Sequence, residues 1–351
     1  MKVLIIGAGL LGAAIAYRLA PHARVTVIEA TSPAAQASGK SFGWINASFY
    51  LNPAHHALRV QAIAAHRRLD ARLRTGIQWT GTLWWEETGP SFEATQETLL
   101  DLGYPTRLIG PDEFQRLEPS IPTPPERALL FPTEGAVDAA DLTHRLLTAA
   151  MGQGAQLILG TPVTGLIGSS RITAVRTDQG PIHADHIILA TGTATPDLLG
   201  AVGFYLPLLP RPGVLLRSEP LPPLINHILV GPGGEIRQDA AGHLLTPASL
   251  SHQSDRATTV APLADLAEAT RARLKTLLPD VDVAWSRITL AHRPVPEHGL
   301  PVVGQVRPGL TVAVMHSGVT LAPLMGELVA AEVLGQGDSP LLTPYRPALF
   351  I

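Results

Sequence analysis

The residues whose spacing has the clearest chemical meaning are three glycines near the start of the chain. Gly7, Gly9 and Gly12 form the pattern G-x-G-x-x-G directly after the apolar run VLII. The first glycine allows a tight turn, the second lets the backbone approach a pyrophosphate, and the third lets a helix pack closely on the strand. The open N–H groups at the start of that helix attract an anion. The pattern predicts a phosphate-binding turn, with a ligand-free structural turn as the alternative.

A single acidic residue, Glu29, completes this pattern. It follows the apolar run 24–28 and lies 17 residues beyond Gly12, where a carboxylate can accept hydrogen bonds from the ribose diol of a dinucleotide. Together with a helix expected at 10–19, these residues predict a dinucleotide-binding unit. The pattern does not choose between a flavin and a nicotinamide dinucleotide.

Short apolar strands that alternate with helices must position these residues. Strands that are apolar throughout are typical of a parallel sheet buried on both faces. We therefore predict an α/β protein with a Rossmann-like unit, whose parallel sheet carries a β-meander, and a mixed-sheet α+β substrate unit. A helix is also expected at 54–75. We expect His55 and His56 on a solvated face of this helix, with a place in the lining of the pocket as the alternative. Further expected elements are strands at 3–6, 186–190, 283–291 and 310–315, and helices at 141–151, 263–278 and 323–334.

The composition restricts the function classes. The 351 residues predict two domains, and the net charge of −3 provides no basic surface for nucleic acid or an anionic membrane. The chain has no cysteine, which excludes disulfides, thiolate metal sites and cysteine nucleophiles. No histidine spacing indicates a metal site, and no apolar run is long enough for a transmembrane helix. We expect a cytoplasmic enzyme.

Nine segments, in their order and spacing, resemble the D-amino acid oxidase, glycine oxidase and sarcosine oxidase family of FAD-dependent oxidoreductases. The resemblance covers nearly the whole chain. It implies a flavoenzyme that oxidises the C–N bond of a small amino acid or amine to an imine by hydride transfer to flavin N5. The segments are VLIIGAGLLG (3–12), SGKSFGW (38–44), LEPSI (117–121), EGAVDAADLT (134–143), IHADHIILATG (182–192), LLPRPG (208–213), GEIRQDAAGHLL (234–245), HRPVPEHGLPVVG (292–304) and HSGVTLAP (316–323).

The resemblance also implies which residues bind FAD. The last loop and helix start match the element at the pyrimidine edge of the flavin, where helix N–H groups can stabilise the negative charge of the reduced ring. The implied residues are Gly7, Gly9, Gly12 and Glu29 for the ADP part, Ser38, Gly39 and Lys40 for the loop beside the flavin and pyrophosphate, Val163 for the adenine, Ala190, Thr191 and Gly192 for the turn beside the cofactor, and Gly318, Val319, Thr320 and Leu321 for the pyrimidine edge.

Two departures from the family pattern affect this implication. Relatives with covalent flavin use a cysteine or a histidine, whereas this chain has no cysteine and has Lys40 at the position of a linking histidine. We therefore expect noncovalent FAD. His298 replaces an aspartate that is common in the family segment containing it.

The substrate residues are expected on the second unit. Arg293 matches the family arginine that holds the substrate carboxylate, for which a planar guanidinium fork is suited; a surface or interdomain ion pair is the alternative. Arg237 is the second candidate, with an exposed strand residue beside the turn at 240–242 as the alternative. His316 could donate a hydrogen bond to flavin or substrate, with a structural histidine as the alternative. Tyr50 and Tyr205 could close the pocket.

The binding signals divide the chain into discontinuous domains. Residues 1–45, 130–200 and 295–351 are expected to form the FAD-binding domain, and residues 46–129 and 201–294 the substrate-binding domain.

Two other functions use the same features. A nicotinamide-dependent dehydrogenase would share the glycine pattern, and a flavin-binding subunit of a hetero-oligomeric amine dehydrogenase would share most of the chain. For an enzyme, oxygen or a quinone or other electron-transfer partner would reoxidise the flavin, and an oligomer is possible in either case.

Overall fold

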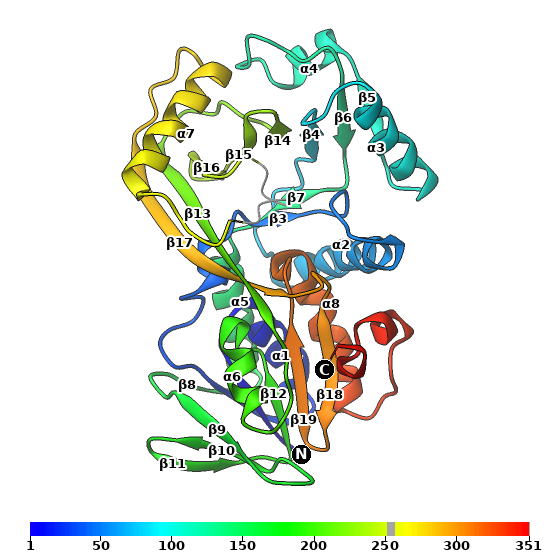
Figure 1. Ribbon diagram of the computed structural model, residues 1–351, viewed down its shortest axis with the longest axis vertical. Coiled ribbons are helices and arrows are strands. Elements are labelled where there is room, and N and C mark those ends of the chain that lie inside the picture. The colour runs from blue at the N-terminus through cyan, green and yellow to red at the C-terminus, as the bar shows by residue number, and fades with distance from the viewer. Residues whose placement is uncertain (251–256, 351) are drawn as a thin grey trace.

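The computed structural model describes residues 1–250 and 257–350. Its two large sheets lie one above the other in Figure 1. The lower sheet has six strands in the order β18-β19-β12-β1-β2-β8. Its strands are parallel except for β18, which pairs antiparallel with β19 at one edge. The bounds are β1 Lys2–Ile6, β2 Arg24–Ile28, β8 Gln156–Ile158, β12 His186–Leu189, β18 Val302–Arg307 and β19 Leu310–Val314.

The central strands β1, β12 and β19 of the lower sheet are mostly apolar, and both of their faces are buried. Along β1, Val3 and Ile5 belong to the core that includes the helices α1, α5 and α8. Leu4 and Ile6 belong to a second core, which includes residues of the meander β9–β11 and of the short helix α6. This arrangement confirms the predicted α/β class. The bounds are α1 Leu10–Leu19, α5 Ala139–Gly152, α6 Thr195–Gly200, α8 Gly318–Val333, β9 Val163–Ile167, β10 Ala174–Thr177 and β11 Gly180–His183.

The upper sheet is mixed, as predicted for the second unit. It has eight strands in the order β17-β13-β16-β15-β14-β4-β6-β5, and β14 pairs parallel with β4. The two long strands β13 and β17 pair from Leu208 to Ser218 and extend from this sheet down towards the lower unit (Figure 1). The bounds are β4 Thr82–Trp84, β5 Arg107–Ile109, β6 Ala128–Phe131, β13 Leu208–Pro220, β14 Ile228–Gly231, β15 Gly234–Gln238, β16 His243–Pro247, β17 Trp285–Pro296, α3 Pro90–Asp101, α4 Pro111–Leu117 and α7 Leu263–Leu277.

Short elements connect and complete the two units. The strands β3 (Trp44–Ile45) and β7 (Gly135–Ala136) form a two-stranded ladder between the sheets. Short turns of 3₁₀ helix lie in or beside segments that the resemblance assigns to the cofactor, and at the end of the chain. They are η1 Ala37–Lys40, η2 Gly192–Ala194, η3 Pro340–Tyr345 and η4 Pro347–Leu349.

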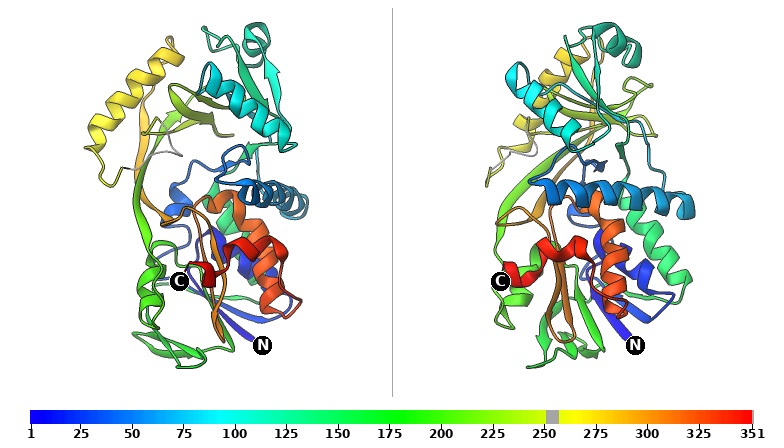
Figure 2. Two further views of the ribbon diagram at one scale, coloured as in Figure 1. Left: turned by 45° about the vertical axis from the view of Figure 1, so that its right-hand side comes forward. Right: turned by 90° about the vertical axis from the view of Figure 1, so that its right-hand side faces the viewer.

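Helix α2 (Pro53–Leu73) lies between the two units, where Figure 2 shows it crossing below the upper sheet. Its start is set by Asn52, whose side chain accepts the His55 N–H. The expectation that His55 and His56 face solvent is wrong, since they are only 5% and 4% exposed. The reason is that α2 packs against α8 on one side, while His56 contacts Tyr50 and Tyr104 on another. The buried face of α2 is therefore wider than that of a surface helix. Burial, together with Arg59 and His56, lowers the pKa of His55 to about 3.

Helix α8 begins five residues earlier than expected, at Gly318 rather than Pro323. Proline has no N–H, so Pro323 cannot complete the usual helical hydrogen bond to the carbonyl of Val319. His66 of α2 supplies the missing donor, because its Nε2 lies 2.8 Å from that carbonyl oxygen. The contact with His66 therefore stabilises a first turn of α8 that lies before the proline, whereas the sequence pattern predicts that the helix begins at the proline.

Two expectations concern the chain as a whole. None of the helices in the described ranges combines the length and apolarity needed to cross a bilayer. The predicted domain boundaries stay a prediction.

Candidate active site

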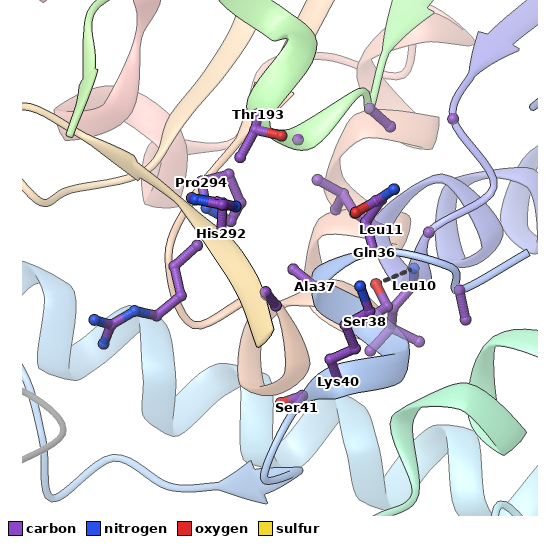
Figure 3. Close-up of a pocket in the computed structure, with 18 of the residues that line it drawn as sticks. Leu10, Leu11, Gln36, Ala37, Ser38, Lys40, Ser41, Thr193, His292 and Pro294 are labelled. Carbon is purple, nitrogen blue, oxygen red and sulfur yellow. Dashed lines mark hydrogen bonds between the residues drawn. The ribbon is translucent and has the colours of Figure 1, made fainter. Parts of the chain in front are cut away.

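A cavity of about 720 Å³ lies at the carboxyl ends of the parallel strands, between the two units. In open α/β sheets this edge is the usual position for ligands. Residues that follow β1, β2, β12 and β19 line one side, and residues of β13, β15, β16 and β17 line the other. Figure 3 shows Leu10 and Ser38 on one side of the cavity and His292 and Pro294 on the other.

The glycine turn forms a close contact that only glycine allows. Gly7 has a φ of +104°, and a Cβ at this position would overlap the carbonyl oxygen of Ala190. A Cβ at Gly12 would likewise overlap the carbonyl oxygen of Gly7, so the helix could not sit as close to the strand. Gly9 precedes α1 and provides no side-chain cap, while the Leu10 N–H donates to Ser38 Oγ at 3.0 Å. Gly9 offers no side-chain cap to the other N–H groups of this helix start, which fits a pyrophosphate.

Glu29 is held at one end of the cavity. One of its carboxylate oxygens accepts the Ala8 N–H at 2.9 Å, and the other accepts the Thr31 N–H at 3.0 Å. These bonds fix the carboxylate beside the glycine turn, and a carboxylate has further lone pairs for a ribose diol. Val163 lines the same cavity.

A second uncapped helix start, that of α8, faces the cavity. Ser317 precedes it in the left-handed region with a φ of +59°, and its side chain does not cap the helix. Gly318, Val319 and Thr320 line the cavity, so the N–H groups of the first turn of α8 are available to an electron-rich ligand. The two helix starts suit the two ends of a molecule that carries phosphates and an acceptor-rich ring.

The wall formed by the upper sheet carries one arginine and one buried carboxyl group. Arg293 of β17 lines the cavity, and its Nε and Nη2 donate to the carbonyls of Arg211 and Pro212 at 3.2 and 3.1 Å. Glu235 of β15 lines the same cavity and is buried. Burial and the neighbouring Glu86 raise the pKa of Glu235 to about 8, against the lowering effect of Arg293 and Arg273.

Arg237, the second arginine candidate, is placed differently. Its Nε donates to the carbonyl of Phe42 at 2.6 Å, and its guanidinium stands 5.5 Å from the centre of that ring. It lines a separate hollow of about 100 Å³ together with Ser38 and Gly39. Burial lowers the pKa of Arg237 to about 10. Arg237 therefore stabilises the loop after η1 through its hydrogen bond to Phe42, and it does not line the main cavity.

Most of the residues implied by the resemblance line the main cavity. Gly12 lies behind the turn, Gly39 packs against the Ala34 carbonyl, and Leu321 is fully buried in the helical core. Tyr205 is 79% exposed and is not part of the lining. The residues that do line the cavity are Gly7, Gly9, Glu29, Ser38, Lys40, Val163, Ala190, Thr191, Gly192, Arg293, His316, Gly318, Val319 and Thr320.

The sequence interpretation missed Glu235, Asn46 and Arg59, all of which line the cavity. Glu235 stands in the segment GEIRQ, in which Arg237 was the candidate because a substrate carboxylate requires a cation. Arg59 could have been found from the helix start at Asn52, because that start places it on the same face as His55. Within the described ranges, no group of three histidine, aspartate or glutamate residues is arranged to hold a metal ion.

Comparisons with known proteins agree with this geometry. The chain is 29% identical over 368 residues to the glycine oxidase of Geobacillus kaustophilus, covering 98% of this chain and 95% of that protein. It is 28% identical over 366 residues to the glycine oxidase of Pseudomonas aeruginosa, covering 99% and 98%. The crystal structure of the Geobacillus kaustophilus enzyme matches with a TM-score of 0.86 at 26% identity over 98% of each chain.

A structure with lower sequence identity shows the same fold. The L-proline dehydrogenase from P. horikoshii matches with a TM-score of 0.88 at 20% identity, covering 99% of this chain and 97% of that one. Among protein families, the DAO family, described as FAD dependent oxidoreductase, matches residues 2–332. Because that match spans nearly the whole chain, the protein belongs to the DAO family and is an FAD-dependent oxidoreductase that acts on amino acids or amines.

Proposed function

We propose that this enzyme oxidises the C–N bond of a small amino acid to an imine, with glycine as the first substrate to test. The observation that supports this proposal is that one cavity contains the glycine turn, the start of α8 and, on the opposite wall, Arg293 and Glu235. Arg293 offers a cation to the carboxylate of an amino acid, and Glu235, which is mostly protonated at neutral pH because its pKa is about 8, offers a polar group to the amino nitrogen. The glycine oxidases among the relatives share the same fold.

Each group of the protein has a distinct part in the proposed reaction. Arg293 would hold the substrate carboxylate, and Glu235 would face its amino group. When bound, FAD would supply the hydride acceptor for this oxidation. The substrate would bind with its amino nitrogen neutral, so that loss of the Cα hydride leaves the iminium form of the product. The N–H groups of Gly318, Val319 and Thr320 would stabilise the negative charge at the pyrimidine edge. Positioning and electrostatics are therefore the main contributions of the protein.

Arg293→Ala tests the carboxylate contact. The purified holoenzyme is mixed anaerobically with glycine, sarcosine, D-alanine and L-proline, and bleaching of the visible flavin band is followed. Loss of a charge-assisted contact to carboxylate costs about 3 kcal/mol, so kcat/KM for the best substrate should fall by about 100-fold. Arg287→Ala, on the same strand, is the matched control. Unchanged kinetics in Arg293→Ala would refute the assignment.

The family membership favours FAD over the nicotinamide dinucleotide that shares the glycine pattern. We propose that FAD is held noncovalently and that oxygen or a quinone reoxidises it. Release of the flavin on denaturation tests the first point, and rapid mixing of the reduced enzyme with oxygen or with a quinone distinguishes the two acceptors. Size-exclusion chromatography tests the alternative that the chain acts as a subunit of a larger assembly.

A further inference from the structure

Two polar residues of the cavity wall have no part in the function proposed above. Asn46 directly follows β3, and Arg59 lies on α2, thirteen residues further along the chain. Both line the cavity, yet the two residues are only 3% and 1% exposed. A buried arginine is costly unless its charge is paired or hydrogen-bonded, so its position at the cavity needs an explanation.

Arg59 fixes the orientation of Asn46. Its Nε donates to the Asn46 carbonyl at 3.1 Å, and its Nη2 donates to Asn46 Oδ1. A guanidinium has only donors, so the amide must turn its oxygen towards Arg59 and its NH₂ group away from it. Neither Asn46 Nδ2 nor Arg59 Nη1 forms a hydrogen bond with a residue in the described ranges. The pair therefore presents donors to the cavity.

The nearby carboxylate of Glu134 does not neutralise the Arg59 guanidinium by direct contact. Glu134 is the acidic group that most affects Arg59, but its carboxylate accepts from Trp44 Nε1 at 3.0 Å, the Tyr104 hydroxyl at 2.8 Å and the Ser48 N–H at 3.1 Å. No ion pair joins Glu134 to Arg59 within the described ranges. Burial lowers the pKa of Arg59 to about 10, so the group stays charged at neutral pH.

The pair adjoins the start of α8. The Asn46 N–H donates to Thr320 Oγ1 at 3.4 Å, and the Thr320 hydroxyl donates to the Trp44 carbonyl at 3.2 Å. These two bonds connect the end of β3 to the first turn of α8, whose N–H groups also face the cavity. Donors of three kinds, backbone amide, side-chain amide and guanidinium, thus occur in one region of the cavity lining.

We propose that Asn46 and Arg59 bind the carbonyl edge of the flavin pyrimidine ring and stabilise the reduced cofactor. That ring offers two carbonyl oxygens in its plane, and it gains negative charge on reduction. Donors fixed in advance at the site of developing charge are effective because they need no reorganisation. The inference rests on the flavin orientation of the proposed function, with its pyrimidine edge at α8, and is independent of the substrate.

Asn46→Asp is the sharpest test, because its carboxylate can still accept the hydrogen bond from Arg59 Nη2, while the backbone carbonyl keeps the one from Nε. The substitution removes the amide donor and neutralises the guanidinium while keeping the contact between β3 and α2. The reduction potential of the holoenzyme flavin is measured against reference dyes, and the dissociation constant of sulfite is measured by titration. We expect the equilibrium constant for two-electron reduction of the flavin to fall at least tenfold, which lowers the reduction potential by about 30 mV. We also expect the dissociation constant of sulfite to rise at least tenfold.

Two further variants separate charge from structure. Arg59→Met should also lower the reduction potential and raise the dissociation constant of sulfite. Arg59→Lys should give smaller changes than Arg59→Met, because lysine keeps the positive charge but lacks the planar guanidinium. Arg72→Met, on an exposed part of α2, is the control and should leave both quantities unchanged. If Arg59→Met does not fold, Asn46→Asp and Arg59→Lys decide the question.

Two results would overturn the inference. One is an Asn46→Asp holoenzyme with wild-type reduction potential and sulfite affinity, including the case in which FAD merely binds more weakly. The other is a change confined to the KM of carboxylate substrates, which would assign the pair to substrate binding. Neither measurement of the flavin uses a substrate, so a wrong substrate assignment in the proposed function leaves this test unaffected.

Discussion

The two walls of the cavity are built in different ways. The wall on the six-stranded sheet depends on backbone shape. Gly7 packs against the backbone of Ala190, and Gly12 packs against the backbone of Gly7, so neither position has room for a side chain. The opposite wall depends on side-chain identity, since Arg293 and Glu235 lie on separate strands and are more than fifty residues apart in the chain.

This difference predicts how each wall responds to substitution. Adding an atom to a wall made of close backbone contacts disrupts both the fold and the cofactor site. Changing a side chain on the opposite wall alters charge and ligand contacts while the strands remain paired. Three substitutions test this contrast, in order of decreasing effect.

Gly12→Ala should have the largest effect. The added methyl group would overlap the carbonyl oxygen of Gly7 and force α1 away from β1. Overpacking of this kind costs about 3 kcal/mol, so the Tm and the FAD content of the purified protein should both fall. Gly152→Ala is the control, because a Cβ there meets nothing within 4 Å. A Gly12→Ala protein with normal Tm and full FAD content would contradict the backbone role of the first wall.

Glu235→Gln should change the pH dependence of stability. The pKa of Glu235 is raised from 4.5 to about 8, so its contribution to stability is fully present below pH 4.5 and is lost as the pH rises towards 8. The variant has no carboxyl group to ionise, so it should match the wild type near pH 4.5 and exceed its Tm near pH 8. Glu219→Gln, at an exposed position of β13, should show no such trend, and a difference in Tm that is constant across pH would argue against the raised pKa.

Glu29→Gln should have the smallest effect. The amide oxygen can still accept one of the hydrogen bonds from Ala8 and Thr31, but the charge and one acceptor are lost. We expect the dissociation constant of FAD to rise about tenfold, which corresponds to the loss of a single hydrogen bond to a charged group, with little change in Tm. Fluorescence titration of the apoprotein measures this constant, with Glu126→Gln as the exposed control. A loss of more than a thousandfold would show that this wall also depends on side-chain charge.

The elements with strong local patterns were predicted well. The helix 10–19 and the strand 24–28 have the expected bounds in the structure. The start of α8 was misplaced because the donor that compensates for Pro323 comes from His66, more than 250 residues away in the sequence. The burial of His55 and His56 was missed for a related reason, since it depends on what packs against α2 from both sides.

The sequence by itself determined the dinucleotide-binding unit, because a turn, a close helix and a buried parallel strand are set by residues within one short segment. Only the tertiary structure decided that Glu235 reaches the cavity, that Arg237 supports a loop from behind, and that Arg59 orients Asn46. Such roles depend on distances between side chains of separate elements, and those distances are fixed by sheet pairing and helix packing rather than by spacing along the chain.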